Sequence, residues 1–437
     1  MKKRLALFIY AILLMNLVGF TSVERYQSHM KFEQITQGNG LSQGSISAIL
    51  QDSKGFMWFG TQSGLNKYDG YKFEVFRNDP TDSQSISFNF ITALFEDSRG
   101  NIWVGTQNGL NRYVYEKKKF IRYFADQEDG NLSHNFINTI CEDKQGRIWI
   151  GTPFGLNRYD HQTRRFKRYF AGNSLSGELN SHIIRALCLD RNGILWIGTI
   201  NGGLNCFLGD EKGFVNYASG TDSRYNFIQT LFEDHSGELW VGTPLAGLAR
   251  FDRDNRKLIF YQHDPNDPNS LSDNRVRTIF ESRNRRLWIG TVDGLNRFNR
   301  RMENFYVYKN RTSDRFSLNF NIISAIYEGN NGILWIGTEG RGLNKFTKRS
   351  DFFKKFIPEP KNPNSLNNSF VYPLIEDRNG ELWVGTLGGG INRLDRKTGR
   401  YLFYRFNPAD SRTLSSDFIT GLYEDRTGNI WVGTRNS

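Results

Sequence analysis

Hydrophobic and polar positions recur along this chain in a fixed order, and the order repeats nine times. An apolar run of about six residues leads into a short polar segment that contains Asp and Gly. An apolar residue, Trp, a second apolar residue, Gly and Thr then follow. In the second copy the apolar run is residues 90–95 and the closing pair is Gly105-Thr106. The repeat is therefore the first feature to interpret, before any single residue.

All nine tryptophans of the protein occupy the same position in the repeat, so the tryptophans mark the copies. Neighbouring tryptophans are 44 to 48 residues apart. A fixed period of this size indicates an array of similar supersecondary units. The nine are Trp58, Trp103, Trp149, Trp196, Trp240, Trp288, Trp335, Trp383 and Trp431, and we expect them to be buried structural residues.

Each repeat is predicted to hold four short strands and no helix. The first run is apolar on both faces, which is typical of a strand buried on both sides. Asp followed three residues later by Gly favours a hairpin turn into the Trp-containing strand. Gly-Leu-Asn-Arg-Tyr predicts a third strand, and segments such as Phe120–Tyr123 predict a fourth.

Four strands in about 45 residues predict an all-β fold, a β-propeller of four-stranded antiparallel blades around a central channel. Stacked blades bury the faces that a single ribbon would expose. A linear β-solenoid is the alternative architecture. The residue ten before each Trp is small or Pro, for example Ala48 and Ala93. We expect this position to leave room for the indole.

The pattern Asp-x-x-Gly-x-Ile/Leu-Trp-Ile/Val-Gly-Thr-x-x-Gly-Leu-Asn-Arg-Tyr resembles the two-component regulator propeller repeat, and the resemblance covers residues 31–437. It implies an extracytoplasmic sensor region, commonly with two seven-bladed propellers in tandem. It also implies that a further β-domain, a membrane helix and a cytoplasmic output module follow. The output module of that family is usually a histidine kinase and sometimes a diguanylate cyclase.

Residues 1–22 are interpreted as a signal peptide or an uncleaved signal anchor. Met1-Lys2-Lys3-Arg4 is basic and residues 5–20 are apolar, a run that is short for a membrane span. In either case the repeats are exported. The family resemblance adds a periplasmic or extracytoplasmic location, with attachment to the inner membrane through a C-terminal segment beyond this chain.

Residues 31–357 are predicted to form a seven-repeat propeller, and residues 358–437 two further repeats of an incomplete second propeller. Pro358, Pro360 and Pro363 support this boundary because proline cannot continue a strand ladder. A single eight- or nine-bladed ring and a truncated product are the alternatives. Residues 31–40 resemble a fourth strand, and we expect them to complete the last blade of the first ring and remove its open edge.

The formal charge of +12 is spread over the repeats. Many cations occupy one repeat position, as Lys67 and Arg112 do, so they predict a solvated face rather than a nucleic-acid site. Attraction of an anionic ligand such as an acidic polysaccharide is the functional alternative. Cys141, Cys188 and Cys206 do not make a disulfide framework, although a bridge between the first two stays open.

Two polar columns, fourteen and eleven residues before each Trp, are the candidate ligand-binding positions because inner strands would carry them to the channel. The alternative is that Asn and Ser bond loop backbone at the strand starts. For Arg185 and Arg277 a functional role is favoured, because an unpaired buried charge is costly. The candidate channel-lining residues are Asn89, Asn135, His182, Arg185, Asn226, Gln229, Asn274, Arg277 and Asn321.

The sequence predicts no catalytic residue, no metal site and no cofactor. The six histidines lack metal-ligand spacing. Carboxylate pairs such as Glu96-Asp97 recur in most repeats, and neighbours on a strand point to opposite faces. A feature repeated in this way indicates architecture rather than catalysis.

These observations predict the exported input region of a membrane signalling receptor, and the expected ligand is a small molecule of the glycan or oligosaccharide class. A homodimer is expected in the full-length receptor, and no nucleic acid. The alternatives are a carbohydrate-active propeller enzyme, the sensor region of a diguanylate cyclase, and a passive scaffold.

Overall fold

The computed structural model describes residues 30–126, 128, 130–172, 177–217, 223–347, 356–359, 362–396 and 398–435. The chain divides into two compact units, Met1–Lys348 and Arg349–Ser437, which are described separately below. The predicted signal segment, residues 1–22, lies outside the described residues. Within the described ranges, no helix combines the length and the apolar composition that crossing a bilayer requires.

The first blade shows how one repeat folds. Its inner strand β2 (Ile46–Gln51) turns at the Asp-x-x-Gly segment into β3 (Met57–Thr61), the strand that carries the Trp. β4 (Gly64–Tyr68) and β5 (Phe73–Phe76) complete an antiparallel sheet in the order β2-β3-β4-β5. β3 is buried along its whole length, as expected for a strand inside a stack of sheets.

Five further four-stranded sheets repeat this plan, each in sequential strand order. Two short 3-10 turns, η1 (Gln37–Asn39) and η2 (Ser223–Asn226), lie outside the sheets. The strands of the five sheets are β6 (Ile91–Glu96), β7 (Ile102–Thr106), β8 (Gly109–Val114) and β9 (Lys119–Tyr123); β10 (Thr139–Glu142), β11 (Ile148–Thr152), β12 (Gly155–Tyr159) and β13 (Phe166–Tyr169); β14 (Ile184–Leu189), β15 (Leu195–Thr199), β16 (Leu204–Phe207) and β17 (Phe214–Tyr217); β18 (Thr230–Glu233), β19 (Leu239–Gly242), β20 (Leu248–Asp252) and β21 (Lys257–Tyr261); and β22 (Val276–Glu281), β23 (Leu287–Thr291), β24 (Gly294–Asn299) and β25 (Asn304–Tyr308).

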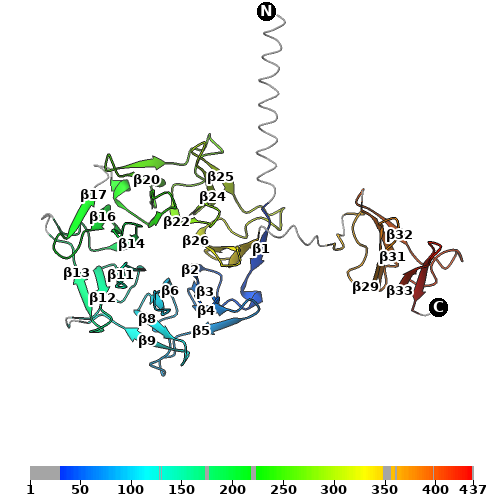
Figure 1. Cartoon of the computed structure of the whole chain (residues 1–437), viewed down its shortest axis with the longest axis horizontal. Helices are drawn as coiled ribbons and strands as arrows, with labels where there is room; N and C mark the ends of the chain where they lie inside the picture. The colour runs from blue at the N-terminus through cyan, green and yellow to red at the C-terminus, as the bar shows by residue number, and fades with distance from the viewer. Residues whose placement is uncertain are drawn as a thin grey trace, which may run out of the picture. The chain divides into compact units, whose positions relative to one another are not determined.

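The seventh blade closes the ring with a strand from the other end of the unit. β26 (Ile323–Glu328), β27 (Leu334–Thr338) and β28 (Leu343–Phe346) are followed in the sheet by β1 (Phe32–Ile35), which pairs antiparallel with β28. We call β1 the latch strand; it covers the edge that β28 would otherwise expose (Figure 1). The latch expected from residues 31–40 is therefore present.

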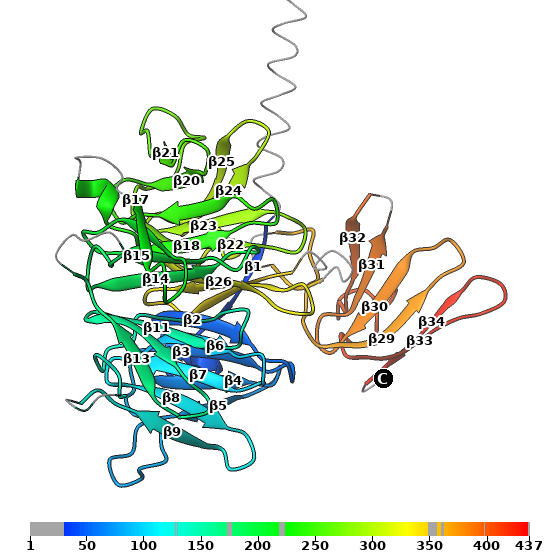
Figure 2. The same ribbon diagram turned by 60° about the vertical axis from the view of Figure 1, so that its left-hand side comes forward.

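The predicted fold class is confirmed: the first unit is a ring of seven antiparallel blades, with the inner strands nearest its centre (Figures 1 and 2). The second unit contains one four-stranded sheet of β29 (Val371–Glu376), β30 (Leu382–Thr386), β31 (Ile391–Asp395) and β32 (Arg400–Tyr404). It also contains a two-stranded sheet of β33 (Ile419–Glu424) and β34 (Ile430–Thr434).

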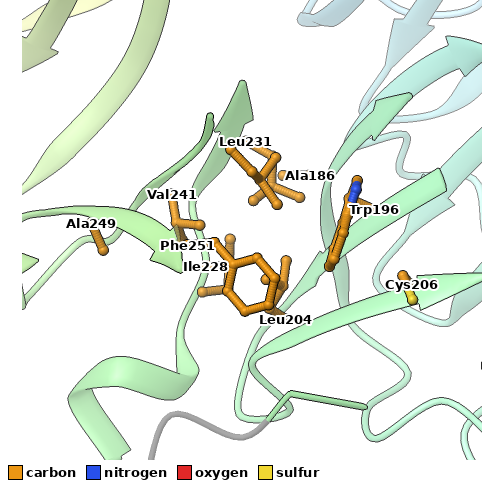
Figure 3. Close-up of a cluster of buried hydrophobic side chains, with 10 residues drawn as sticks. Ala186, Trp196, Leu204, Cys206, Ile228, Leu231, Val241, Ala249 and Phe251 are labelled. Atoms are coloured by element: carbon orange, nitrogen blue, oxygen red, sulfur yellow. The ribbon is translucent and has the colours of Figure 1, made fainter. Parts of the chain in front are cut away.

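The seven indoles of the first unit are 0–3% exposed and lie between neighbouring blades. Trp196 packs edge-on against Phe251 of the next blade at 5.2 Å between ring centroids, inside the apolar cluster of Figure 3. Trp335 makes the equivalent contact across the ring closure, edge-on against Tyr68 at 6.1 Å. In the second unit Trp383 is half-buried and Trp431 is 61% exposed. Blade stacking thus explains the tryptophan column.

The small residue ten before the Trp has a different partner from the one expected. In the first ladder Ala48 is opposite Gly60, whereas Trp58 is opposite Leu50. A Cβ on the equivalent Gly198 would lie 2.4 Å from Ile228 of the next blade and 3.3 Å from the small residue Ala186. The small residue and the glycine together leave room for the neighbouring blade's isoleucine, and the indole is not the group accommodated.

The Asp of each hairpin turn binds the indole six residues later, a bond that the sequence analysis did not foresee. In the second blade Trp103 Nε1 donates to Asp97 Oδ2 at 2.8 Å. The other carboxylate oxygen accepts the backbone N–H of Asn101 at 2.8 Å. The same indole–carboxylate bond forms at Trp58, Trp149, Trp196, Trp240, Trp383 and Trp431.

The glutamate before that Asp connects neighbouring blades. Glu96 accepts the backbone N–H of Ser53 in the preceding blade, at 2.8 Å from one oxygen and 3.0 Å from the other. Glu142, Glu233, Glu281 and Glu328, of the third, fifth, sixth and seventh blades, make the corresponding bond to their preceding blades. At the ring closure Gln51 takes this role toward Asn330. The recurring carboxylate pairs are thus parts of the architecture.

The cations of the third strands are not a fully solvated face. Lys67 and Arg297 are only 9% and 7% exposed. In the ladders these cations lie opposite the Trp, as Trp58 and Lys67 do. Lys67 Nζ is 5.3 Å from the Trp58 ring centroid, and Arg393 is 5.2 Å from that of Trp383. These cations are regularly spaced because they stack on the indoles, an interaction that favours a cation at this position of the repeat.

The three cysteines are free thiols. Cys141 and Cys206 are buried and Cys188 is half-buried. Burial raises the pKa of the Cys188 thiol to about 12 and that of Cys141 well above its ordinary value. In this structure Cys141 and Cys188 are therefore separate thiols, and no disulfide joins them.

Candidate functional site

A β-bulge interrupts the inner strands at one repeated place. In the first blade the register passes from Ile46 to Ala48 and leaves Ser47 without a partner on β3. A bulge residue leaves the ladder, and bulges commonly re-aim a side chain beside a functional site. The skipped residues are Ser47, Thr92, Arg185, Arg277 and Ser324, all eleven before their Trp.

In the third and fifth blades the residue at this position directly precedes the strand. The backbone N–H groups of Asn138 and Gln229 each donate to a glycine carbonyl of the second strand, with N–O distances of 2.8 Å. One polar residue per blade is thus presented where the inner strands begin, around the centre of the ring (Figure 1). This belt is the second polar column of the sequence.

Small members of the belt bond to the neighbouring blade. Ser47 Oγ donates to the Ile91 carbonyl at 2.6 Å, and Ser324 Oγ donates to the Ile46 carbonyl at 2.5 Å. Asn138 Nδ2 donates to the Ile184 carbonyl at 2.7 Å. These three side chains therefore join blades, which is a structural role.

Arg185 differs because both of its hydrogen-bond partners are uncharged amides. Its Nε donates to Gln229 Oε1 and its Nη1 to Asn138 Oδ1, both at 3.2 Å. The salt bridges of the described residues do not include a carboxylate for this guanidinium. Burial, and secondly the charge of Arg277, lower the pKa of Arg185 below its ordinary value.

Arg277 lies at the same level in the sixth blade. Its guanidinium is 3.7 Å from Glu339 Oε2, and the two side chains are 40% and 45% exposed. Glu339 follows β27 directly, in the connection to β28. This exposed pair is loose, and such pairs contribute little stability. We call Asn138, Arg185, Gln229 and Arg277 the channel-mouth cluster.

The first polar column mostly bonds loop backbone. Asn89 Oδ1 accepts the N–H of Asn78 at 2.8 Å, and Asn135 Oδ1 accepts that of Ala125 at 2.7 Å. Their own carbonyls accept N–H groups of the glycines that open the third strands. Asn274, Asn321 and His182 make the matching bonds, and the Asn226 carbonyl accepts from Gly203. These hydrogen bonds fit the alternative interpretation, in which this column bonds loop backbone at the strand starts.

An exposed aromatic group lies beside the cluster. Phe154, in the connection between β11 and β12, is 52% exposed and stacks on His182 at 5.4 Å with an interplanar angle of 12°. Phe170, 43% exposed, meets Phe154 edge-on at 5.7 Å. His182 precedes Arg185 by three residues, about 10 Å of extended chain. Sequence reasoning missed Phe154, because the second residue after Gly-Thr varies between repeats.

Two basic cavities lie elsewhere on the first unit. One, of about 390 Å³, is lined beside the latch strand by Gln34, Asn319, Arg311, Arg315 and Arg341. The other, of about 450 Å³, lies at the far end of the sixth blade from Arg277 and is lined by Arg285, Arg286, Arg297, Arg300, Arg301 and Tyr306. Among the described residues, no cluster of His, Cys, Asp or Glu is arranged to hold a metal ion.

The fold and the belt define a class: a seven-bladed propeller that presents variable polar residues at the mouth of its channel. The chain belongs to the two component regulator propeller family. The family repeat matches residues 40–63, 85–108, 131–154, 178–201, 222–244, 270–293, 317–340, 365–388 and 413–436.

Known proteins of two kinds are similar to this chain. The extracellular domain of a protein described as a hybrid two component system from B. thetaiotaomicron is 27% identical over 93% of this chain, with a TM-score of 0.64. The chain covers about half of that domain, 52%. "Histidine kinase P4" of Formosa agariphila is 39% identical over 77 residues, which is 18% of this chain and 6% of the kinase.

A virginiamycin B lyase from Staphylococcus aureus shares the fold alone. It is 14% identical over 73% of this chain and 99% of the lyase, with a TM-score of 0.56. Identity this low carries no statement about activity.

Proposed function

We propose that this chain is the exported ligand-sensing input region of a membrane signalling receptor of the two-component sensor kinase type, and that it recognises a glycan or oligosaccharide. One observation carries the proposal: the chain, which consists of repeats of the two component regulator propeller family, matches an extracellular domain of a hybrid two component system over 93% of its length. The partial match to a histidine kinase agrees with this class of protein.

Location and assembly follow from the same proposal. The repeats lie on the extracytoplasmic side, and the full-length receptor is attached to the inner membrane and forms a homodimer. The signal passes because the ligand binds one arrangement of the dimer more tightly than another and shifts the population toward it. A diguanylate cyclase in place of the kinase would use the same input step.

The ligand is tested by a thermal-shift screen of the purified chain against neutral and acidic oligosaccharides. A ligand that binds only the folded protein stabilises it by about 2.7 kcal/mol at a concentration of 100 times its Kd. We expect one class of saccharide to raise the melting temperature in a saturable way. If monosaccharides, neutral oligosaccharides and acidic oligosaccharides all leave the melting temperature unchanged, glycan recognition is refuted.

No observation in the described residues favours the alternative of a carbohydrate-active enzyme. Such an enzyme needs two carboxyl groups about 5 to 10 Å apart beside the substrate. The recurring Glu and Asp of the turns are instead bonded to neighbouring backbone and to indoles. Glu339 at the channel mouth is the counterion of Arg277. Product analysis after incubation with the bound saccharide would reveal cleavage.

A further inference from the structure

The two arginines of the channel-mouth cluster have a single carboxylate, Glu339, to balance their positive charges. Arg185 is held by two neutral amides, Asn138 and Gln229, and Arg277 has one exposed counterion, Glu339. A half-buried guanidinium without a carboxylate is unfavourable unless something else neutralises it. The charge of Arg277 adds to this cost, because it lowers the pKa of Arg185 beyond the effect of burial.

The place of these arginines makes a purely structural role a poor explanation. At the same position the first and seventh blades hold Ser47 and Ser324, each of which donates to a backbone carbonyl of the next blade. Arg185 makes no such bond to backbone; its two bonds go to side-chain amides. Arg185 therefore reaches the neighbouring blades through side-chain amides rather than backbone, and the fourth and sixth blades carry a cation where the first and seventh carry a serine.

Guanidinium groups match the geometry of planar anions. Arg presents several N–H donors in one plane, which bind carboxylate and sulfate oxygens in pairs. Gln229 and Asn138 add amide groups that fix the orientation of Arg185. A ligand with an anionic group would thus find donors already arranged, and would supply the missing counter-charge.

An aromatic surface completes the site on the same face. Phe154 and Glu339 lie in equivalent connections, between the second and third strands of their blades. Glu339 contacts Arg277, so this tier of connections surrounds the channel mouth. The exposed face of Phe154, backed by His182, offers a negative ring face to the C–H groups of a sugar.

We propose that the channel mouth of the first propeller is a binding site for acidic saccharides, in which Arg185 and Arg277 pair with carboxylate or sulfate groups and Phe154 and His182 stack on a sugar ring. The inference rests on the proposed function and adds the chemical class of the ligand and its place. It distinguishes this site from the arginine-lined cavity at the other end of the sixth blade.

The test is isothermal titration calorimetry of the chain with three tetrasaccharides of equal length: tetragalacturonate, a sulfated carrageenan tetramer and neutral cellotetraose. We expect an acidic tetramer to bind and cellotetraose not to bind. Arg185→Gln and Arg277→Gln each raise the Kd of the acidic tetramer about tenfold or more, because a charge-assisted bond is lost. Phe154→Ala, at an exposed position, raises it about fivefold.

Two variants separate binding from folding. Arg185→Lys keeps the charge and retains part of the affinity that Arg185→Gln loses. Arg301→Gln removes the same charge from the other arginine cavity, and its Kd equals that of the unmodified chain. Melting temperatures of all variants identify any that misfold, and Arg277→Gln, at a half-exposed side chain, carries the test if Arg185→Gln is unstable.

The two proposals fail in different ways. If cellotetraose binds as tightly as the acidic tetramers and the Arg185 and Arg277 variants are unaffected, glycan sensing stands and the acidic site is overturned. If Arg301→Gln weakens binding instead, the site is in the wrong place and is overturned. If no tetramer binds, the acidic site is overturned, and the wider thermal-shift screen decides whether glycan sensing stands.

Discussion

At the scale of single residues, the turn Asp connects the hairpin to the blade interface. One of its oxygens holds the turn backbone and the other accepts the buried indole N–H, as Asp97 does for Asn101 and Trp103. Two blades depart from this arrangement. Trp288 donates to Ser282 Oγ at 3.3 Å, and Trp335 Nε1 is buried without a partner, because Gly329 stands where the Asp should be.

Replacing that glycine should stabilise the seventh blade. The backbone of Gly329 is not left-handed, and a Cβ there would lie 3.5 Å from Trp335 Nε1. We expect Gly329→Asp to satisfy the indole and raise the free energy of unfolding by about 1 kcal/mol. Urea unfolding followed by tryptophan fluorescence measures it. Gly329→Ala, which adds a side chain without an acceptor, should not reproduce the gain.

The same carboxylates predict a loss of stability in acid. Burial alone would raise the pKa of Asp234, but bonds from Trp240 and Arg300 bring it below its ordinary value. A carboxyl group with a lowered folded-state pKa stabilises the protein above its unfolded pKa, and this contribution is lost as the pH falls through the folded value. The unfolded value is about 3.9.

Stability should therefore fall as the pH drops below about 4, which urea midpoints between about pH 7 and pH 3 would show. Asp234→Asn keeps an acceptor for Trp240 and removes the titrating group. Its midpoint should be lower at neutral pH and should decline less in acid. An unchanged acid slope in this variant would assign the loss to other carboxyl groups.

At the scale of the elements, each blade interface depends on a strand position without a side chain. The glycine two residues after the Trp lies under the first inner-strand isoleucine of the next blade, as Gly198 lies under Ile228. Dense packing leaves no space to absorb an added methyl group. The glycine column thus fixes how closely two sheets approach.

Gly198→Ala should destabilise the first unit by about 1–3 kcal/mol, because the added Cβ would meet Ile228 at 2.4 Å. Chemical unfolding measures the change. Gly433→Ala is the matched control at the same repeat position, where the nearest atom would be at an ordinary 3.4 Å. Combining Gly198→Ala with Ile228→Ala should give a loss smaller than the sum of the single losses. Strict additivity would contradict the direct contact.

The repeat period was enough to predict the blades and the latch strand, because hydrophobic periodicity and turn residues act locally. It could not identify the belt of bulge residues as such. A bulge depends on which residues of two strands pair, and the sequence does not show this pairing. Arg185 and Ser47 occupy the same repeat position, although Arg185 bonds side-chain amides and Ser47 bonds a backbone carbonyl. Phe154 was missed for a similar reason, since its exposure is set by neighbouring blades.

At the scale of the whole molecule, the ring depends on the latch strand. Phe32 is 3% exposed and packs on Phe346 at 6.0 Å, while β1 covers the open edge of β28. An uncovered edge strand would offer unpaired N–H and C=O groups to other chains. Ring closure and solubility therefore depend on the same contact.

Phe32→Ala should loosen the latch and destabilise the first unit by about 3–5 kcal/mol. Hydrogen exchange of the β28 amides should accelerate, and light scattering should show self-association as the edge is exposed. Tyr71→Ala, at a 95% exposed aromatic side chain, serves as the control and should change neither. Exchange that stays slow in β28 would mean that the seventh blade holds together without its fourth strand.

The latch also sets the order of events when the chain is made. Gln34, in the latch strand β1, bonds Ser317, a residue 283 positions later in the chain. The first six sheets can assemble before β1 pairs with β28, and only this pairing completes the ring. Joining points so distant along a polymer is entropically costly and slow, so closure is expected to be the last step of folding and the one at which a nascent chain is most exposed to wrong partners.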